Sequence, residues 1–135
     1  SGNLAFDVSK TSDASVAAKI ETAVEAHLGK PVQAMVREQK DIERILANNP
    51  FDGQYGSHKE MHVLFLKAKL SEENEKWLSE TAPPQERFAA SGREIYCHLP
   101  MGVADSYLGR GQFEKKLKVA VTARNWRTVE KLAEL

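Results

Sequence analysis

The chain has 135 residues, of which 41% are hydrophobic and 28% charged, a length and balance typical of a globular domain and unlike disordered or fibrous proteins. Its formal net charge is zero and no apolar stretch approaches the roughly 20 residues of a membrane-spanning helix, so neither nucleic acid nor a membrane is an expected partner. The single cysteine, Cys97, excludes an internal disulfide framework and favours a cytoplasmic protein.

The first predicted element is a strand over Leu4–Val8, where apolar and polar residues alternate. Ser12 or Asp13 then caps a helix whose apolar residues recur at helical spacing as far as Leu28, after which a glycine and a proline follow. Residues 32–36 predict a second strand. A short helix comes next and ends before a proline, because proline disfavours helical geometry in the residue before it.

The middle of the chain contains a near-continuous apolar run, Met61–Leu66, which predicts a central strand. Glutamates after Ser71 suit the N-terminal end of a helix that reaches Leu78, and two prolines then break the chain. The alternation of strands and helices predicts an α+β fold with helices packed on a mixed or antiparallel sheet. The remaining elements are a hairpin and two closing helices, predicted over residues 87–90 with 94–99, 104–117 and 122–135.

Six stretches, in order along the chain, carry a resemblance to a known family. They are S-G-N-L-A-F at the start, A-A-K-I-E-T-A-V-E-A-H-L in the first helix, A-N-N-P-F at 47–51, H-V-L-F-L at 62–66, G-R-E-I-Y-C-H-L-P at 92–100 and T-A-R-N-W-R-T-V-E-K-L at 122–132. Through them the chain resembles the bacterial family of uncharacterised proteins catalogued as domain of unknown function 1697. The resemblance implies ferredoxin-like α+β halves in a small cytoplasmic protein, and it implies no activity.

One domain is expected over residues 1–135, or else two intertwined ferredoxin-like halves over about residues 1–66 and 67–135. Members of the family usually carry a further strand and helix upstream, with S-G-N inside their second strand. The chain is therefore expected to lack that segment, unless its first two residues are a cloning remnant. Leu4–Val8 would then be an unpaired edge strand, and because exposed edges pair with other chains we expect a homodimer there.

Three motifs that suggest metal or catalytic chemistry fail on their spacing. In H-K-E-M-H at 58–62 the glutamate fits neither order found in zinc proteases, and the segment runs into a strand, where residues four apart are about 13 Å apart. Cys97 and His98 are neighbours on a strand and point to opposite faces, so Cys97 is expected in the core. G-R-G at 109–111 lacks the third glycine of a dinucleotide loop. No metal site and no cofactor are predicted.

The last predicted helix gives the strongest indication of a ligand site. At about 100° per residue, Trp126 lies on its apolar face and Arg124 and Arg127 lie on the opposite face. Thr122 would be the N-cap, and the free backbone N–H groups that follow it suit phosphate or another anion. Asn125 falls within the apolar stripe, where its amide needs hydrogen-bond partners, and we expect it to tie the helix start to a neighbouring loop.

Polar residues of the hairpin and of the segment after it are expected to complete this pocket, because Tyr96 and His98 share the polar face of their strand. An anionic small molecule is the expected ligand. The predicted ligand-binding residues are Arg93, Tyr96, His98, Ser106, Arg124, Asn125 and Arg127.

Three functions remain open on the sequence alone. The preferred one is a small domain that binds phosphate or an anionic metabolite at the last helix. The second is an enzyme acting on a phosphorylated or acidic small molecule, with His98 or Tyr96 as proton carrier, for which an abnormal His98 pKa would be the sign. The third is a protein- or RNA-interaction module that uses the basic face of the last helix, for which an extended basic surface would be the sign.

Overall fold

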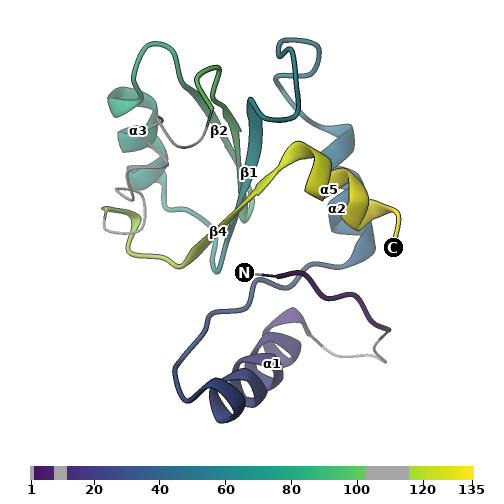
Figure 1. Ribbon diagram of the computed structural model, residues 1–135. Helices are drawn as coiled ribbons and strands as arrows, with labels where there is room; N and C mark the ends of the chain where they lie inside the picture. The colour runs from purple at the N-terminus through teal and green to yellow at the C-terminus, as the bar shows by residue number, and fades with distance from the viewer. Residues whose placement is uncertain (1, 8–11, 103–115) are drawn as a thin grey trace.

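A computed structural model describes residues 2–7, 12–102 and 116–135 of the chain (Figure 1). Within those residues, four strands form one antiparallel sheet in the order β2-β3-β1-β4, so the fold is α+β as predicted. The elements in chain order are α1 (Asp13–Leu28), α2 (Gln39–Ala47), β1 (Met61–Leu66), α3 (Glu72–Thr81), β2 (Arg87–Ser91), β3 (Glu94–His98), β4 (Val121–Asn125) and α5 (Trp126–Ala133).

Strand β1 is central, as its apolar sequence predicted, and every one of its residues is buried. Val63 and Phe65 point to the side of the sheet covered by α2 and α5 (Figure 1), where they join one core cluster. Leu64 and Leu66 point to the opposite side, which α3 covers, and join a second core cluster. The sheet is therefore enclosed between two helical layers, which is why the strand lacks the polar alternation of a half-exposed strand.

The predicted hairpin is confirmed: β2 and β3 pair around Gly92, whose φ of 58° is left-handed and costs glycine little. The two-residue turn sets the register, in which Ser91 lies opposite Glu94 and Arg87 opposite His98. The first helix also ends as predicted. The Ser12 side chain accepts the Ser15 N–H at 3.1 Å, and a left-handed glycine follows Leu28.

Two predicted strands are wrong. Residues 2–7 and 32–36 are extended but lie outside the sheet. Leu4 and Phe6 are 74% and 56% exposed, so the alternation at the start of the chain covers no core. In the second segment, the Ala34 N–H and C=O bond to side chains of α1 and of the residue after β1, so its hydrogen bonds need no neighbouring strand.

The start of the last helix is also corrected. Residues 122–125 were predicted as its first turn, but they form β4 with Val121 and pair with β1. The helix α5 begins at Trp126, and Asn125 is its N-cap in place of Thr122. Pairing with the free edge of the buried strand β1 stabilises residues 122–125 as a strand by more than their weak helical preference would stabilise a helical turn. The other closing helix, predicted over residues 104–117, falls largely outside the described residues.

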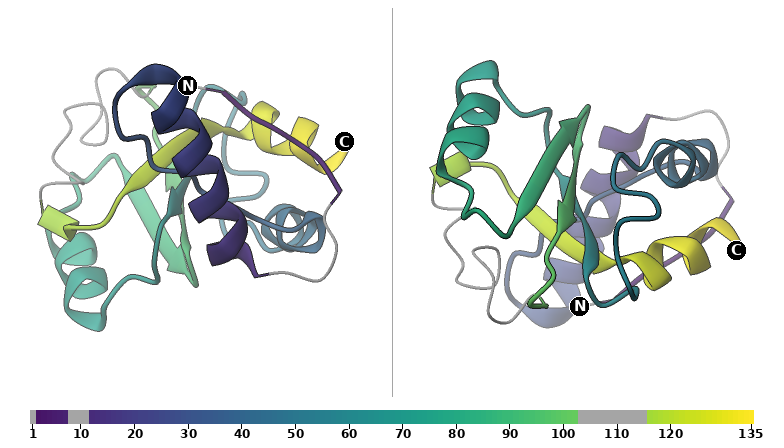
Figure 2. Two further views of the ribbon diagram at one scale, coloured as in Figure 1. Left: turned by 90° about the horizontal axis from the view of Figure 1, so that it is seen from below. Right: turned by 90° about the horizontal axis from the view of Figure 1, so that it is seen from above.

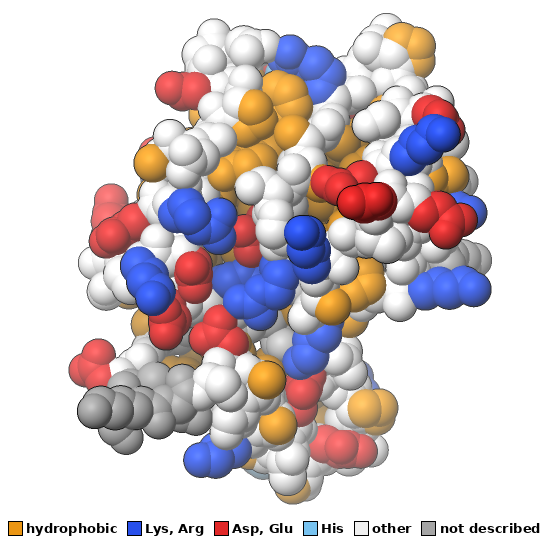
Figure 3. Space-filling view, turned by 180° about the vertical axis from the view of Figure 1, so that it is seen from behind, with side chains coloured by type: hydrophobic (Ala, Val, Ile, Leu, Met, Phe, Trp, Pro, Cys, Tyr) orange, Lys and Arg blue, Asp and Glu red, His pale blue; other side chains and the backbone are white. Residues whose placement is uncertain are grey.

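Helix α1 lies apart from the other helices, below the sheet in Figure 1, and the view from below shows it in front of that end of the sheet (Figure 2). Ala17 is its buried residue, and it belongs to neither core cluster. Ion pairs hold the helix to the sheet instead. Lys67 donates to Glu21 at 2.7 Å, and Glu21 also accepts the Ala34 N–H at 2.9 Å. Seen from behind, acidic and basic side chains are interleaved over the molecule (Figure 3).

No helix in the described part of the chain combines the length and the apolar character that crossing a bilayer requires.

Replacing Trp126 with alanine tests whether the last helix is held by its apolar face. Trp126 is packed in the first core cluster beside Val129, so Trp126→Ala should lower the free energy of unfolding by about 3–5 kcal/mol. Urea denaturation followed by circular dichroism measures this. The neighbouring exposed position provides the control, since Arg127→Ala should change stability by less than about 0.5 kcal/mol. A near-neutral Trp126→Ala would show that the indole is not a core group.

Candidate functional site

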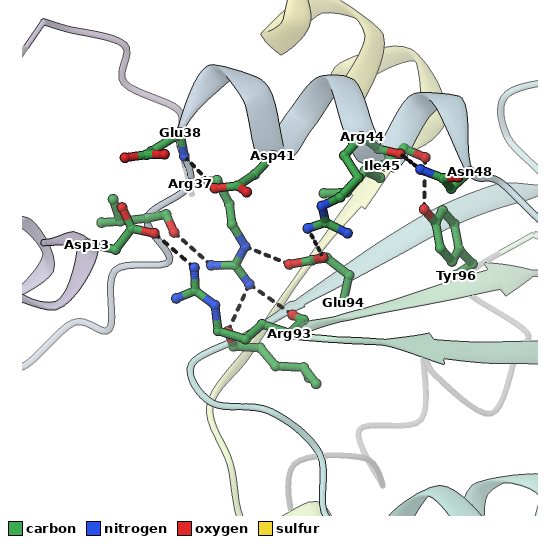
Figure 4. A network of polar contacts seen from close by, with 12 residues as sticks. Asp13, Arg37, Glu38, Asp41, Arg44, Ile45, Asn48, Arg93, Glu94 and Tyr96 are labelled. Carbon is green, nitrogen blue, oxygen red and sulfur yellow. Dashed lines mark hydrogen bonds and ion pairs between the residues drawn. The ribbon is translucent and has the colours of Figure 1, made fainter.

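A buried carboxylate at the start of β3 organises a polar network that joins several elements (Figure 4). Glu94 is 1% exposed, and each of its two oxygens is paired. The Arg37 Nε donates to one oxygen at 2.7 Å, and the Arg44 Nη2 donates to the other at 3.0 Å. Burial lowers the pKa of Arg37 while the Glu94 contact opposes that shift. Because both oxygens are occupied, this carboxylate acts as a structural anchor.

Arg93, a predicted ligand-binding residue, belongs to this network. Its Nη2 donates to Asp13 at 2.9 Å, and its carbonyl accepts from the Arg37 Nη2 at 2.9 Å. The same Arg37 nitrogen also donates to the Leu66 carbonyl at 3.0 Å. These contacts bring together the start of α1, the segment before α2 and the end of the sheet where the hairpin turns.

Tyr96, the second predicted residue, is a core group beneath α2. It is 2% exposed, and its hydroxyl donates to the Ile45 carbonyl at 2.8 Å. Burial raises the pKa of its phenol. The hydroxyl therefore stabilises the contact between the helix and the sheet.

Two of the predicted residues around the last helix, Arg124 and Asn125, are hydrogen-bonded to other residues of the chain. Arg124 donates to the Asn3 side chain at 3.0 Å and to the Gly2 carbonyl at 3.1 Å. Asn125 accepts the Thr128 N–H at 3.0 Å, so it caps its own helix. The Arg127 side chain is exposed. Ser106, the remaining predicted residue, lies outside the described residues.

The pairing of the strands shows which of the predicted ligand-binding residues lie close together. Across the sheet, Tyr96 and Arg124 lie opposite the same residue, Val63, from the two strands that flank β1. This buried valine separates them. Arg93 and His98 lie at opposite ends of β3. The described members of the predicted set therefore lie in four places: the Glu94 network, the core beneath α2 at Tyr96, the start of α5, and the end of β3 at His98.

His98 is the member of the set with the most distinctive surroundings. Its ring is packed beside Phe51 and Tyr55, with centroid distances of 6.1 and 6.4 Å. Arg87, directly opposite on β2, directs Nε and Nη2 at the imidazole Nδ1 from 3.2 and 2.8 Å. On the other side, a Glu60 oxygen lies 3.7 Å from Nε2.

These contacts assign the protonation of the ring. Because the Arg87 guanidinium can only donate, Nδ1 must accept and the proton of the neutral imidazole lies on Nε2. The His98 side chain is 8% exposed, and Nε2 has no hydrogen-bond partner among the residues that the structure describes. Burial and the Arg87 charge lower the pKa of His98, while Glu60 acts in the opposite direction.

The loop over residues 49–57 forms one wall of this site, and its hydrogen bonds hold it in shape. Asn49 accepts the Phe51 N–H at 2.9 Å. The Glu60 oxygen that points away from His98 accepts the Gly56 and Ser57 N–H groups at 3.0 and 3.1 Å. The Glu60 carboxylate is thus fixed by backbone donors beside the imidazole.

Sequence reasoning missed Arg87, although the hairpin contained the signal. A two-residue turn pairs each residue of one strand with a definite residue of the other. Counting outward from Ser91 and Glu94 places Arg87 opposite His98, as the structure shows. The loop residues Phe51 and Tyr55 had no such signal, because no local rule places a loop against a distant strand end.

The opposite face of the sheet carries a second buried histidine. His62 is 7% exposed, its Nδ1 has no partner within the described ranges, and burial lowers its pKa. Its neighbour across the sheet is Cys97, which is fully buried, as predicted for a core residue. Burial raises the pKa of that thiol far above the neutral range, so it is no nucleophile.

Among the described residues, no group of three or more His, Cys, Asp or Glu side chains is placed to hold a metal ion.

The fold and this site define an α+β protein with a partly buried arginine–histidine contact at one end of its sheet. The family described as "Protein of unknown function (DUF1697)" matches residues 1–96, well over half of the chain. The chain belongs to this family, which confirms the resemblance seen in the sequence. No curated protein and no solved structure matches the chain.

Removing the charge of Glu94 tests whether the network anchors the fold. Glu94→Gln leaves the Arg37 guanidinium buried without an anion, so it should lower the free energy of unfolding by about 3–5 kcal/mol in urea denaturation. Glu43→Gln makes the same change at an exposed position of α2 and should cost less than about 0.5 kcal/mol. Equal small losses in both variants would contradict the anchoring role.

The two buried histidines predict how stability depends on pH. Both folded pKa values lie below the ordinary value of 6.5, so the unfolded chain binds more protons between those values and 6.5. The unfolding free energy should be highest above pH 6.5 and should fall as pH decreases through the folded pKa values, by at most about 1.4 kcal/mol per pH unit for each histidine. Urea titrations at a series of pH values measure the slope. His62→Gln should reduce it, and an unchanged slope would contradict the assignment to His62.

Proposed function

We propose that the protein binds a small oxyanion, a carboxylate or phosphate group, at the site formed by Arg87 and His98. The observation that carries the proposal is the pairing of a fixed guanidinium with a buried imidazole whose Nε2 proton has no partner within the described residues. The family has no function attached to it, so the proposal is based on these contacts alone.

Arg87 supplies the cation that such a ligand needs. Its residue is exposed on an edge strand, and its guanidinium carbon lies 4.8 Å from the centre of the Phe51 ring. Its Nη1 donates to the Gln54 side chain. The aromatic ring and the amide hold the planar group in one orientation, and a guanidinium fixed in this way suits two parallel hydrogen bonds to an oxyanion.

His98 lies directly against the guanidinium that the ligand would bind. Its Nε2–H is a buried donor without a partner within the described residues, which costs on the order of 1–3 kcal/mol. The Glu60 carboxylate lies on the Nε2 side of the ring, away from the Arg87 guanidinium at Nδ1, and two backbone N–H groups bind its outer oxygen. The ligand would therefore meet the Arg87 guanidinium beside the imidazole, in a partly desolvated corner between β2, β3 and the loop over residues 49–57.

The start of α5 is the competing location for an anion, since the sequence predicted it and Arg127 is exposed there. Two contacts make it the weaker candidate. Asn125 already accepts an N–H of the first turn, and Arg124 is bound to residues 2 and 3. A ligand would have to compete with both.

An enzyme acting on a phosphorylated or acidic molecule is the second candidate. The Glu60–His98 contact favours it, because a carboxylate 3.7 Å from an imidazole is a common acid–base arrangement. Tyr96 is not offered as proton carrier, since its hydroxyl is buried and bonded to Ile45. The interaction module is less favoured, because acidic and basic side chains are interleaved on the face shown in Figure 3.

A homodimer through Leu4–Val8 stays a prediction. Residues 4–7 form no strand, so pairing there would require them to join a sheet edge of the partner. The exposed Leu4 and Phe6 side chains are the groups that such a contact would cover.

Histidine side-chain NMR with inorganic sulfate as the probe tests the proposed site. We expect the His98 ring signals to shift saturably with sulfate, because the anion replaces the imidazole as the partner of Arg87. Arg87→Gln should abolish the saturable shift by removing the cation. Arg127→Gln makes the matched change at the competing location and should leave the shift intact. The reverse pattern, loss with Arg127→Gln only, would place the anion at α5 and contradict the proposal.

A further inference from the structure

Arg87 contacts His98 with the same edge of its guanidinium that an oxyanion would bind. Its Nε and Nη2 both point at the His98 Nδ1, and its Nη1 donates to Gln54. The Nε–Nη2 edge of a guanidinium is the fork that an oxyanion binds with two parallel hydrogen bonds. An anion that takes this edge must therefore displace the imidazole nitrogen from it.

Displacement changes what the imidazole can do. While Arg87 donates to Nδ1, that nitrogen must keep its lone pair and cannot carry a proton. Once the guanidinium turns to an anion, the lone pair of Nδ1 is free. A proton from solvent can bind there, and the resulting Nδ1–H can donate to the anion that Arg87 holds. The Arg87–His98 contact and a protonated His98 are thus mutually exclusive.

We propose that anion binding at this site is coupled to uptake of one proton by His98, which then bears a positive charge between the bound anion and Glu60. This inference rests on the proposed function. In this step one N–H bond forms at Nδ1 with a proton taken from the buffer. The Nε2 proton stays in place, and no redox or other covalent change is involved.

The charges that face the ring support the coupling. Arg87 from β2 and Glu60 from the segment before β1 are the charged groups that act on the imidazole, and the loop contributes the uncharged Phe51, Tyr55 and Gln54. In the free site burial and the Arg87 charge keep the His98 pKa low. A bound anion neutralises the second of these causes, and Glu60, 3.7 Å from Nε2, then stabilises the imidazolium.

Linkage makes the coupling reciprocal: if the anion raises proton affinity, protons raise anion affinity by the same factor. Sulfate affinity should therefore rise as pH falls through the neutral range, by up to about tenfold per pH unit for one proton. Sulfate suits this measurement because it does not titrate near neutral pH, so any proton taken up belongs to the protein.

Isothermal titration calorimetry with sodium sulfate near pH 6.5, the ordinary histidine pKa, tests the proposal directly. Titrations in two buffers of different ionisation enthalpy, MES and imidazole, give the number of protons taken up with each anion. We expect a value approaching one in the wild type. His98→Gln keeps an oxygen that can accept from Arg87 but cannot be protonated there, so this variant should bind sulfate with no proton uptake. His62→Gln removes the other buried histidine, on the opposite face, and should retain the uptake.

The calorimetry distinguishes the proton coupling from anion binding at the Arg87–His98 site. Saturable sulfate binding whose affinity and heat do not depend on pH or buffer would overturn the proton coupling and leave the anion site standing. Uptake that persists in His98→Gln would overturn the assignment of the proton to His98. A complete lack of saturable sulfate binding in the wild type would overturn both the coupling and the proposed function.

Discussion

The buried carboxylate of Glu94 is the interaction on which the arrangement of the chain depends. An ionised group inside a protein is tolerated only when its charge is paired and its lone pairs are bonded. Arg37 and Arg44 meet that requirement, and they come from the segment before α2 and from α2 itself. The carboxylate thus determines where this helix crosses the sheet. Through the carbonyl of Arg93, the same network also reaches the turn of the hairpin and the start of α1.

The two parts of the molecule are held by different forces. The sheet is enclosed by apolar residues on both faces, with α2 and α5 on one side and α3 on the other. The first 36 residues contribute little to either cluster. Four of the five large hydrophobic side chains that are exposed in the described residues lie there: Leu4, Phe6, Leu28 and Val32. Ion pairs hold this region, and partly exposed ion pairs weaken with salt, whereas buried apolar surface does not.

The hairpin carries the candidate site because its register is set by the two-residue turn at Gly92. Each strand end then lies at a definite place, and Arg87 faces His98. The loop over residues 49–57 adds the aromatic wall and, with Glu60, the second charge. The site is therefore assembled from a local pairing rule and from one long-range contact. That combination explains why the residues predicted from the sequence include His98 but none of its partners.

Local sequence patterns were enough to predict the features that depend on neighbouring residues: the cap and end of α1, the central strand β1, the β2–β3 hairpin and the burial of Cys97. A helix makes its hydrogen bonds within a few residues, and a doubly buried strand is apolar throughout, so local patterns suffice. Tertiary structure decided the rest. Residues 4–7 and 32–36 have extended sequences but no strand partner, while residues 121–125 became β4 because the free edge of β1 was available. A strand exists only when a second segment supplies its hydrogen bonds, and no local pattern says which distant segment will do so.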